Sequence, residues 1–577
     1  MSTGGIEERR WTLLAFAGLA AAMAIAAALL LWEGRGLTFF VDEWSFGFGD
    51  RTGLDPAEIL APENGHLAVI PVLITKASLE LFGADTALPL RIVSVALHLT
   101  TAGLLFGLLR KAVGDLVALA PAILVLFVGS ASDLLIGSHG MPMLIAVSCG
   151  LGAWLALGTG SGRGDALAAL LLAVGLASNG LTLPFVVGAA AILLAARDPR
   201  WRRLWVVAAP LALYLAWRLA YGDGDGSDFA FANLAALPAF AFDSLGAELA
   251  AVTGLFTAPG VRAESFDDQA GLALAGALLV ALAAGYLAAG WRPPRAALPA
   301  AVGLIALWLL TGAVASPARQ PESARYLYPG AILLLLIAAQ LLAASPWRRR
   351  GSLVLIAVCA IGLLPNLREL HYAGAFFREQ SDQDKAVLAA ADLLGTAAPA
   401  DLPLEQFGDP SGIGVQDLGF TLERYRRSRE RYGTPAFSPR ELEGAVPIAR
   451  EAADRLLGRG LGSALAPTAA PPRALPPRIE ASAEGGEVRG RAGCLLFRPL
   501  AAPAQLVVAV PSSGLWLHPA PGPAVPVALG RFADGFPVGA GSIPGGSSSA
   551  LAIGPGAAAE GWRALLTPSQ PVRVCGV

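Results

Sequence analysis

Long apolar runs separated by short polar loops occupy most of the first 370 residues. The first covers residues 11–32, and the others lie near 87–109, 115–136, 142–158, 166–178, 181–196, 204–221, 270–290, 297–315, 329–344 and 352–365. A helix needs about 20 apolar residues to cross a hydrocarbon core about 30 Å thick. The pattern therefore predicts an all-α polytopic membrane domain with about 11 transmembrane helices.

Two further stretches, 67–82 and 229–256, are apolar at helical spacing but are short or interrupted by polar residues. Such segments are typical of helices that lie along the membrane surface. Asn64 precedes the first stretch at the position of an N-cap, which would place His66 in the first helical turn. An ordinary interfacial histidine is the alternative interpretation of His66, because its ring is amphipathic.

The basic residues assign the loops to the two sides of the membrane. Alternate loops collect Arg9, Arg10, Arg110, Lys111, Arg163, Arg197, Arg200, Arg202, Arg203, Arg292, Arg295, Arg348, Arg349 and Arg350 on one side. The opposite side receives the acidic loops 33–63 and 222–269. By the positive-inside rule the chain is a multi-pass protein of the plasma (inner) membrane, with a cytoplasmic N-terminus and the acidic loops outside.

The composition is typical of a membrane protein, and the motifs that are absent exclude several classes of function. Of the 577 residues, 55% are hydrophobic and 15% are charged, which is too apolar for a soluble domain of this length. No arginine-rich groove with interleaved aromatics is present, so we expect no nucleic-acid partner. Walker, dinucleotide-binding, HExxH and paired CxxC motifs are absent, which leaves nucleotide hydrolysis, dinucleotide redox chemistry and zinc proteolysis without support.

The polarity of the chain changes after the last apolar run. We predict a transmembrane domain over 1–371, an exported helical segment over 372–465, a Pro-rich linker over 466–478 and a small β-rich domain over 479–577. The last region has short Val/Leu runs between Gly, Pro and Ser clusters, for example at 505–510 and 525–529. The exported C-terminal region is therefore of mixed α/β type and ends in a small β-domain.

The four cysteines divide into two pairs by context. Cys149 and Cys359 lie inside apolar runs, where a thiol behaves as a small hydrophobic group. Cys494 and Cys575 lie in the polar C-terminal region and fit a disulfide that ties the two edges of the β-domain if the region is exported. Two unrelated thiols are the alternative.

Two adjacent carboxylates, Asp42 and Glu43, follow the first apolar run and lie among Phe and Trp residues. Aromatic rings favour the headgroup level, and a carboxylate at the bilayer centre costs about 2.5–3.5 kcal/mol, so this pair is expected at the outer interface. A carboxylate there can act as a general base for an acceptor hydroxyl. Glu43 would raise the pKa of Asp42 as a like-charged neighbour, and simple solvation of both side chains is the alternative.

A late outer loop, 316–328, contributes two arginines and two tyrosines at the leaflet boundary. The planar fork of arginine binds phosphate bidentately, so Arg319, Arg325 and Tyr326 are candidates for binding a lipid phosphate. His66, on the same outer side, is a further candidate for binding the substrate or its lipid phosphate. Arg325 has an alternative role as an anchor for the following helix. Asp133 and His139 lie in the second outer loop near a predicted helix end, where solvation is the simpler interpretation.

The layout resembles the GT-C superfamily of polytopic glycosyltransferases. The shared features are the acidic pair after the first span, the Gly65-His66-Leu67 element with its apolar helix, the late Arg325-Tyr326 loop and an exported C-terminal domain. Protein O-mannosyltransferases, lipid A aminoarabinose transferase and arabinofuranosyltransferases belong to this superfamily. The likeness covers roughly the first 370 residues in layout.

The resemblance implies an inverting transfer of a sugar from a polyprenyl-phosphate donor to a glycan, lipid or protein acceptor of the cell envelope. It makes Asp42 the base, with Glu43 beside it, and associates Arg325 and Tyr326 with the lipid phosphate. We predict no cofactor and no metal, because the second outer loop has no clear acidic motif. A transporter or flippase of lipid-linked saccharides and a non-catalytic scaffold are the competing functions; the apolar span centres and the lack of an internal repeat disfavour transport.

Overall fold

The structure is a computed structural model that describes residues 3–40, 43–44, 46, 55–195, 201–222, 229–255, 269–289, 293–316, 319–345, 348–405, 417–462, 464–468, 478–491, 493–554 and 560–577. The chain divides into two compact units. The first comprises Met1–Phe46, Asp50–Leu81 and Ala87–Arg378, and the second comprises Gly47–Gly49, Phe82–Thr86 and Glu379–Val577.

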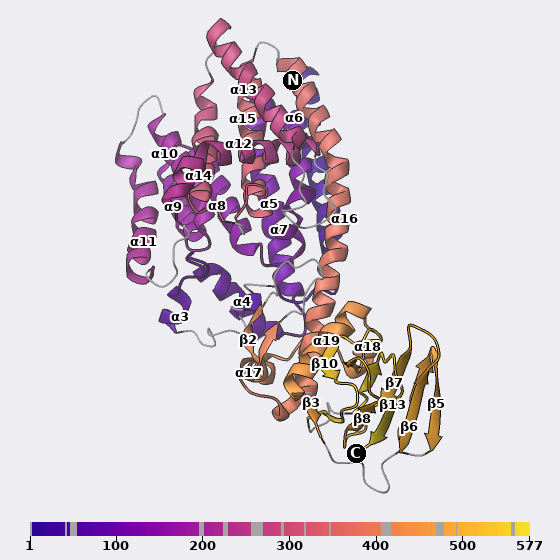
Figure 1. Ribbon diagram of the computed structural model, residues 1–577. Helices are drawn as coiled ribbons and strands as arrows, with labels where there is room; N and C mark the ends of the chain where they lie inside the picture. Colours follow the sequence, from indigo (N-terminus) through magenta and orange to yellow (C-terminus); the bar gives the residue numbers. More distant parts are fainter. Residues whose placement is uncertain are drawn as a thin grey trace. The chain divides into compact units, whose positions relative to one another are not determined.

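The first unit is a bundle of helices (Figure 1). Its α-helices are α1 (Thr3–Glu33), α3 (Pro56–Leu60), α4 (Val69–Phe82), α5 (Leu88–Val113), α6 (Asp115–Leu126), α7 (Ser132–Ile136), α8 (Met141–Leu157), α9 (Gly162–Leu176), α10 (Leu183–Leu194), α11 (Trp205–Tyr221), α12 (Phe231–Thr253), α13 (Gln269–Ala289), α14 (Leu298–Gly312) and α15 (Ala324–Ala344). Short 3-10 turns are η1 (Gly129–Ala131), η2 (Gly180–Thr182), η3 (Trp201–Arg203) and η5 (Arg295–Ala297). Helix α16 (Arg348–Leu394) begins in this unit.

The chain is a multi-pass membrane protein, but its count of long apolar helices differs from the predicted 11. Within the described ranges, 8 helices are long and apolar enough to cross a membrane, or 9 if α6 and α7 form one broken span. The apolar runs at 142–158, 166–178 and 181–196 do form helices, of 17, 15 and 12 residues. The turn at residues 178–180 separates the last two of these helices.

Helix α12 occupies the second stretch that was predicted to lie along the surface. Its length and composition suffice for a span. Near its start, the Asn233 amide donates to the carbonyls of Ala313 and Ala315, which follow α14. Near its end, the carbonyl of Ala251 accepts from Asn366 in α16 at 2.9 Å. Helix α12 therefore crosses the bundle between the end of α14 and α16.

Close helix contacts fix the part of the bundle that carries α8, α10 and α14. Gly188 of α10 faces Trp154 of α8, and a Cβ at this glycine would lie 2.1 Å from the indole ring. The indole N–H donates to the Phe185 carbonyl at 2.8 Å, which satisfies a buried polar group. Because Gly188 has no side chain, α8 and α10 can approach closely. Helix α14 packs beside α10 and α15.

The second unit combines the end of α16 with three helices and two larger sheets. Its elements are η6 (Gly395–Ala397), α17 (Leu422–Tyr432), α18 (Pro439–Glu443), α19 (Pro447–Leu461), β1 (Pro403–Glu405), β2 (Asp417–Thr421), β3 (Ala464–Pro467), β4 (Ala481–Glu484), β5 (Gly486–Arg491), β6 (Cys494–Pro499), β7 (Gln505–Ala509), β8 (Leu515–Pro519), β9 (Val525–Gly530), β10 (Val538–Ile543), β11 (Ser549–Ala552), β12 (Arg563–Leu566) and β13 (Val572–Gly576).

The predicted C-terminal β-region is confirmed. One sheet has the strand order β10-β9-β12-β7-β4, and the other has the order β3-β11-β8-β13-β6-β5. Buried and half-exposed positions alternate along strands such as β7, as expected for a sheet with one apolar face. Strand β3 begins before the predicted 466–478 linker and includes its first two residues, because it pairs with β11; residues 469–477 lie outside the described residues.

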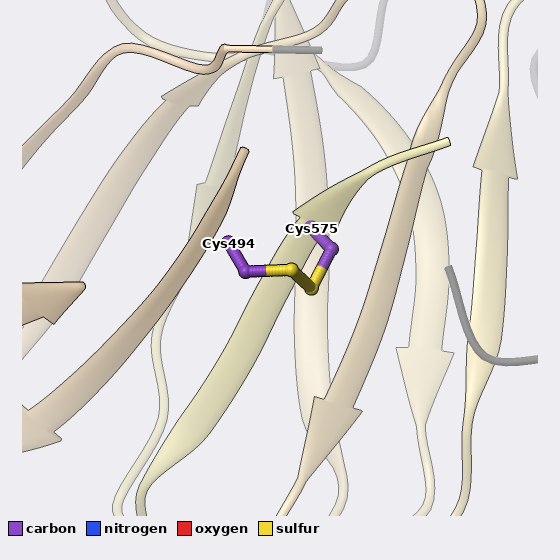
Figure 2. Close-up of a disulfide and its surroundings, with 2 residues drawn as sticks. All are labelled: Cys494 and Cys575. Carbon is purple, nitrogen blue, oxygen red and sulfur yellow. A yellow bond between two sulfur atoms is a disulfide. The ribbon is translucent and has the colours of Figure 1, made fainter. Parts of the chain in front are cut away.

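The predicted disulfide between Cys494 and Cys575 is also confirmed (Figure 2). The two cysteines face each other on the neighbouring strands β6 and β13. The bond therefore joins two interior strands of one sheet instead of the two edges of the domain. Cys149 and Cys359 are buried thiols in the helical unit, as their apolar context predicted.

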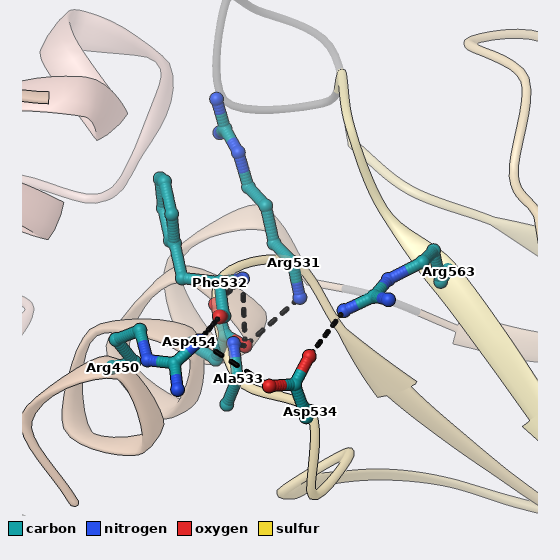
Figure 3. A network of polar contacts seen from close by, with 7 residues as sticks. All are labelled: Arg450, Asp454, Arg531, Phe532, Ala533, Asp534 and Arg563. Carbon is teal, nitrogen blue, oxygen red and sulfur yellow. Dashed lines mark hydrogen bonds and ion pairs between the residues drawn. The ribbon is translucent and has the colours of Figure 1, made fainter. Parts of the chain in front are cut away.

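A buried carboxylate fastens α19 to the turn after β9 (Figure 3). Both oxygens of Asp454 accept hydrogen bonds from the backbone N–H groups of residues 531–533, at 2.8 to 3.1 Å. Arg450 of the same helix donates to the Phe532 carbonyl and contacts Asp534, which also pairs with Arg563. Burial raises the pKa of Asp454 above its ordinary value, although the three N–H donors oppose this effect.

Candidate functional site

A cavity of about 460 Å³ lies in the helical unit, at the ends of α14 and α15 where the late loop joins them. Segments that are far apart in the sequence line it. They contribute Phe46, Glu63, Asn64, Gly65, His66, Ala68, Pro142, Met143, Ser178, Asn179, Gly180, Leu181, Leu183, Tyr214, Arg218, Leu310, Thr311, Val314, Arg319, Arg325 and Tyr326. A volume of this size lies in the range of small-molecule sites, about 300–1,000 Å³.

A tight hairpin brings His66 to the cavity. Glu63 and His66 exchange both backbone hydrogen bonds, at 2.9 and 2.8 Å. The two residues between them have positive φ angles, 49° for Asn64 and 77° for Gly65. Asn-Gly is the preferred pair for a turn with two positive φ angles. The predicted N-cap role of Asn64 is therefore wrong: the residue forms this turn, and α4 begins later, at Val69.

Two anchors hold the hairpin in place. On one side, the Trp217 indole of α11 donates to the Leu60 carbonyl at 2.8 Å. On the other, the Ile70 N–H of α4 donates to the Ala177 carbonyl at the end of α9. The segment between these anchors is short, so its position depends on α9 and α11.

The break between α9 and α10 forms a second wall of the cavity. The Asn179 side chain accepts from the Leu181 N–H at 2.9 Å and caps the short turn η2. Gly180 follows, and a Cβ at this position would lie 3.0 Å from Nδ1 of His66. The missing side chain leaves room for the imidazole. The polar turn that separates α9 from α10 is thus part of the cavity lining.

Three arginines line the same cavity. Arg319 lies in the late loop, where its N–H donates to the Ser316 carbonyl at 2.8 Å. Arg325 is the second residue of α15, with its guanidinium 5.4 Å from the centre of the Tyr326 ring. Arg218 comes from α11, and its buried Nη1 has no hydrogen-bond partner among the described residues. A buried cationic N–H without an acceptor is costly, so the cavity favours an anionic ligand.

Electrostatics set the charge of His66. Burial lowers the pKa of its imidazole from 6.5 to about 4. The positive charges of Arg319, Arg325 and Arg218 act in the same direction, in that order of importance. His66 is therefore neutral near pH 7, when one ring nitrogen accepts a hydrogen bond and the other donates one.

The structure brings together four of the six predicted site residues: His66, Arg319, Arg325 and Tyr326 all line the cavity. Asp42 lies outside the described residues. Glu43 is 2% exposed and is not among the cavity-lining residues that the structure describes. Its carboxylate accepts from the Phe40 N–H at 2.8 Å.

The second outer loop approaches the first. His139 and Asp133 are joined by a 3.0 Å contact. The His139 ring lies 5.9 Å from that of Phe40, which precedes the acidic pair. Asp133 also interacts electrostatically with Arg325. These residues therefore link the first loop to the arginine-lined cavity.

Sequence reasoning missed Arg218, Tyr214 and Asn179. Arg218 and Tyr214 lie four positions apart in the apolar run 204–221, so they share one face of α11. In the predicted topology Arg218 lies at the outer end of its span, which departs from the positive-inside pattern. In the described ranges, no three His, Cys, Asp or Glu side chains converge as a metal site requires.

Comparison with solved structures shows a likeness in fold. No protein-family model and no curated protein sequence matches the chain. The crystal structure of ArnT from Cupriavidus metallidurans bound to undecaprenyl phosphate is similar, with 17% sequence identity and a TM-score of 0.39. The similarity covers 72% of this chain and 85% of that chain.

Proposed function

We propose that the protein is an inverting glycosyltransferase that moves a sugar from a polyprenyl-phosphate donor to a cell-envelope acceptor at the outer membrane face. The single observation that carries the proposal is the cavity with three arginines around a neutral histidine. A phosphate diester matches this cationic lining, and the adjacent bilayer supplies the place for its lipid chain.

The three arginines would bind the donor phosphate and stabilise it as it leaves. Arg218 has a buried N–H that needs an acceptor, and Arg319 and Arg325 flank it from the late loop. A charge-assisted hydrogen bond contributes about 1.5–3 kcal/mol. Charge grows on the phosphate as the glycosidic bond breaks, so these contacts strengthen toward the transition state.

His66 and Tyr326 would orient the donor beside the phosphate. A neutral His66 adds no positive charge and offers both a donor and an acceptor to a phosphate oxygen or a sugar hydroxyl. The Tyr326 ring also carries the Arg325 guanidinium against its face. This contact limits the rotamers available to the arginine.

Asp42 remains the proposed general base, with Glu43 as its neighbour. It lies four positions before Phe46, which lines the cavity. In the proposed step the acceptor oxygen bonds to the anomeric carbon and its proton passes to the Asp42 carboxylate. The bond from the anomeric carbon to the phosphate oxygen breaks, and polyprenyl phosphate leaves with the electron pair.

The proposed location is the plasma (inner) membrane, with the N-terminus in the cytoplasm and the second unit outside. The Cys494–Cys575 disulfide supports export of that unit, because disulfides persist in oxidising compartments. The proposed partners are the bilayer, the polyprenyl-phosphate sugar and a glycan, lipid or protein acceptor. We propose no metal or other cofactor and no nucleic-acid partner.

Transport of lipid-linked saccharides is the second candidate, and the buried polar residues of α5 argue against it. A transport path requires polar groups that face a channel. Arg91 instead donates to the Leu30 and Ile136 carbonyls. His98 contacts the Tyr328 hydroxyl at 2.8 Å. These side chains join helices to one another.

The deciding experiment measures transfer from labelled polyprenyl-phosphate sugars by the full chain in reconstituted vesicles. Asp42→Asn should lower turnover about 100-fold or more, the usual contribution of a general base. Glu80→Gln, which changes an exposed carboxylate on α4, is the matched control and should leave turnover unchanged.

A second arm tests the phosphate contacts. Arg218→Gln should weaken donor binding about tenfold or more, because one charge-assisted hydrogen bond is lost. Turnover within a few-fold of the parent for Asp42→Asn would remove the catalytic assignment. Vesicles that flip lipid-linked sugar without any transfer would establish the transport function instead.

A further inference from the structure

A second cavity, of about 350 Å³, lies at the opposite ends of α14 and α15. The first cavity is lined by the end of α14 and the start of α15. This one is lined by the start of α14, at Pro299 and Ala300, and by the later part of α15, at Leu336 and Gln340. The other lining residues are Leu108, Trp154, Ile192, Ala195, Arg295 and Ala296.

The lining suits a hydrocarbon chain. Of the ten described residues that line it, eight are apolar, and the other two are Arg295 and Gln340. Trp154, Ala300 and Leu336 are almost fully buried, so they form fixed walls. An apolar cavity of about 150 Å³ already stays dry and takes up hydrocarbon. In a membrane protein the available hydrocarbon is a lipid acyl chain.

The rim of the cavity is cationic. Arg295 is exposed beside it. Lys111 lies one helical turn beyond Leu108 on the same face of α5, and its Nζ would be 3.6 Å from a Cβ at Gly158. A basic pocket between transmembrane helices is the chemistry that recognises anionic lipid headgroups.

No acidic side chain offsets these cations among the described residues that line the cavity. Asp115 and Asp165 lie at the same end of the bundle, and each is already paired. Asp115 contacts Arg110 at 2.7 Å, and Asp165 contacts Arg203 at 2.6 Å. The charge available to a ligand at this rim is therefore positive.

We propose that this cavity binds one anionic glycerophospholipid, with an acyl chain between α5, α10, α14 and α15 and the headgroup phosphate at Arg295 and Gln340. The site is separate from the proposed transferase cavity and does not depend on that function. A lipid here packs on α14 and α15, whose other ends carry the first cavity, so it would brace both helices.

The test labels the full chain with a photoactivatable phosphatidylglycerol whose reactive group lies on one acyl chain. Peptides that contain Ile192 or Leu336 should carry the label, and phosphatidylcholine with the same reactive chain should label them weakly. Arg295→Gln should reduce labelling about fivefold, the effect of about one basic residue on anionic-lipid binding. Ala296→Trp should block it by filling the mouth.

Arg202→Gln is the matched control, because Arg202 is exposed at the same end but does not line the cavity. It should leave labelling unchanged. An equal loss in both arginine variants would mean that the lipid responds only to surface charge. Equal labelling by phosphatidylcholine, or competition by undecaprenyl phosphate but not by phosphatidylglycerol, would also overturn the proposal. Ultraviolet circular dichroism of each variant confirms folding.

Discussion

Removing the positive charge of Arg319 is expected to raise the pKa of His66. Burial and three arginines together lower this pKa from 6.5 to about 4, a difference of 2.5. Burial is the largest cause and Arg319 the second. In Arg319→Gln the pKa of His66 should therefore rise above 4 but remain below 6.5, because burial and two arginines still lower it.

The assay is a pH titration of the imidazole signals by nuclear magnetic resonance, with isotope-labelled histidine in detergent micelles. The chain has only five histidines, so a His66→Gln sample identifies the signal by its absence. Arg325→Gln and Arg218→Gln should raise the pKa by successively smaller amounts. Arg35→Gln is the control, because Arg35 stacks on Trp32 and does not line the cavity.

The same titration predicts acid sensitivity. The folded protein keeps His66 neutral, whereas the unfolded chain protonates it below 6.5, so the folded state loses stability as the pH falls from 6.5 toward 4. The full loss is about 3 kcal/mol, from 2.5 multiplied by about 1.36 kcal/mol. A His66 signal that titrates near 6.5 in the parent, or one that shifts as much in Arg35→Gln as in Arg319→Gln, would refute this reasoning.

Further changes test the supports of the site and of the second unit. Gly65→Ala places a side chain at a φ of 77°, so it should cost about 1 kcal/mol and reduce sugar transfer in the vesicle assay. Trp217→Phe leaves the Leu60 carbonyl without its donor and should lower thermal stability by about 1–3 kcal/mol. Cys575→Ser opens a loop of 81 residues and should destabilise the second unit by about 4–5 kcal/mol in denaturant titration of the oxidised protein. Burial raises the pKa of Asp454 above 3.8, so the unfolded chain loses this proton at a lower pH than the folded protein does. The stability of the folded protein should therefore fall as the pH rises from 3.8 to the folded pKa. Asp454→Asn should remove this pH dependence, which thermal unfolding at several pH values would measure.

Sequence reasoning located much of the cavity, because loop sidedness is a strong constraint in a membrane protein. His66, Arg319, Arg325 and Tyr326 were assigned to one side by alternation of the loops, and all four line one cavity. Arg218 was not predicted as a site residue, because it lies within an apolar run and one arginine changes the mean hydropathy of such a run only slightly. Its proximity to the late loop depends on helix packing, which a linear pattern does not contain.

Some residues favour two local structures equally well, so the sequence alone does not choose between them. Asn64 is favoured both as an N-cap and in a turn with positive φ; Gly65 after it decides for the turn. The apolar runs beside Asn179 were predicted to be spans, but the helices that they form, α9 and α10, have only 15 and 12 residues. The C-terminal β-region and its disulfide were predictable, since alternating apolar residues and paired cysteines are local features of the sequence.

The wide sequence separation of the cavity-lining segments has a consequence for biosynthesis. The hairpin with His66 emerges from the ribosome about 250 residues before the late loop with Arg319 and Arg325. Until those residues are translated and α15 inserts, the half-built bundle holds Arg218 without its later neighbours. A ribosome that stalls before Tyr326 would therefore leave an inserted fragment that lacks part of the cavity lining and exposes polar groups that the complete bundle covers.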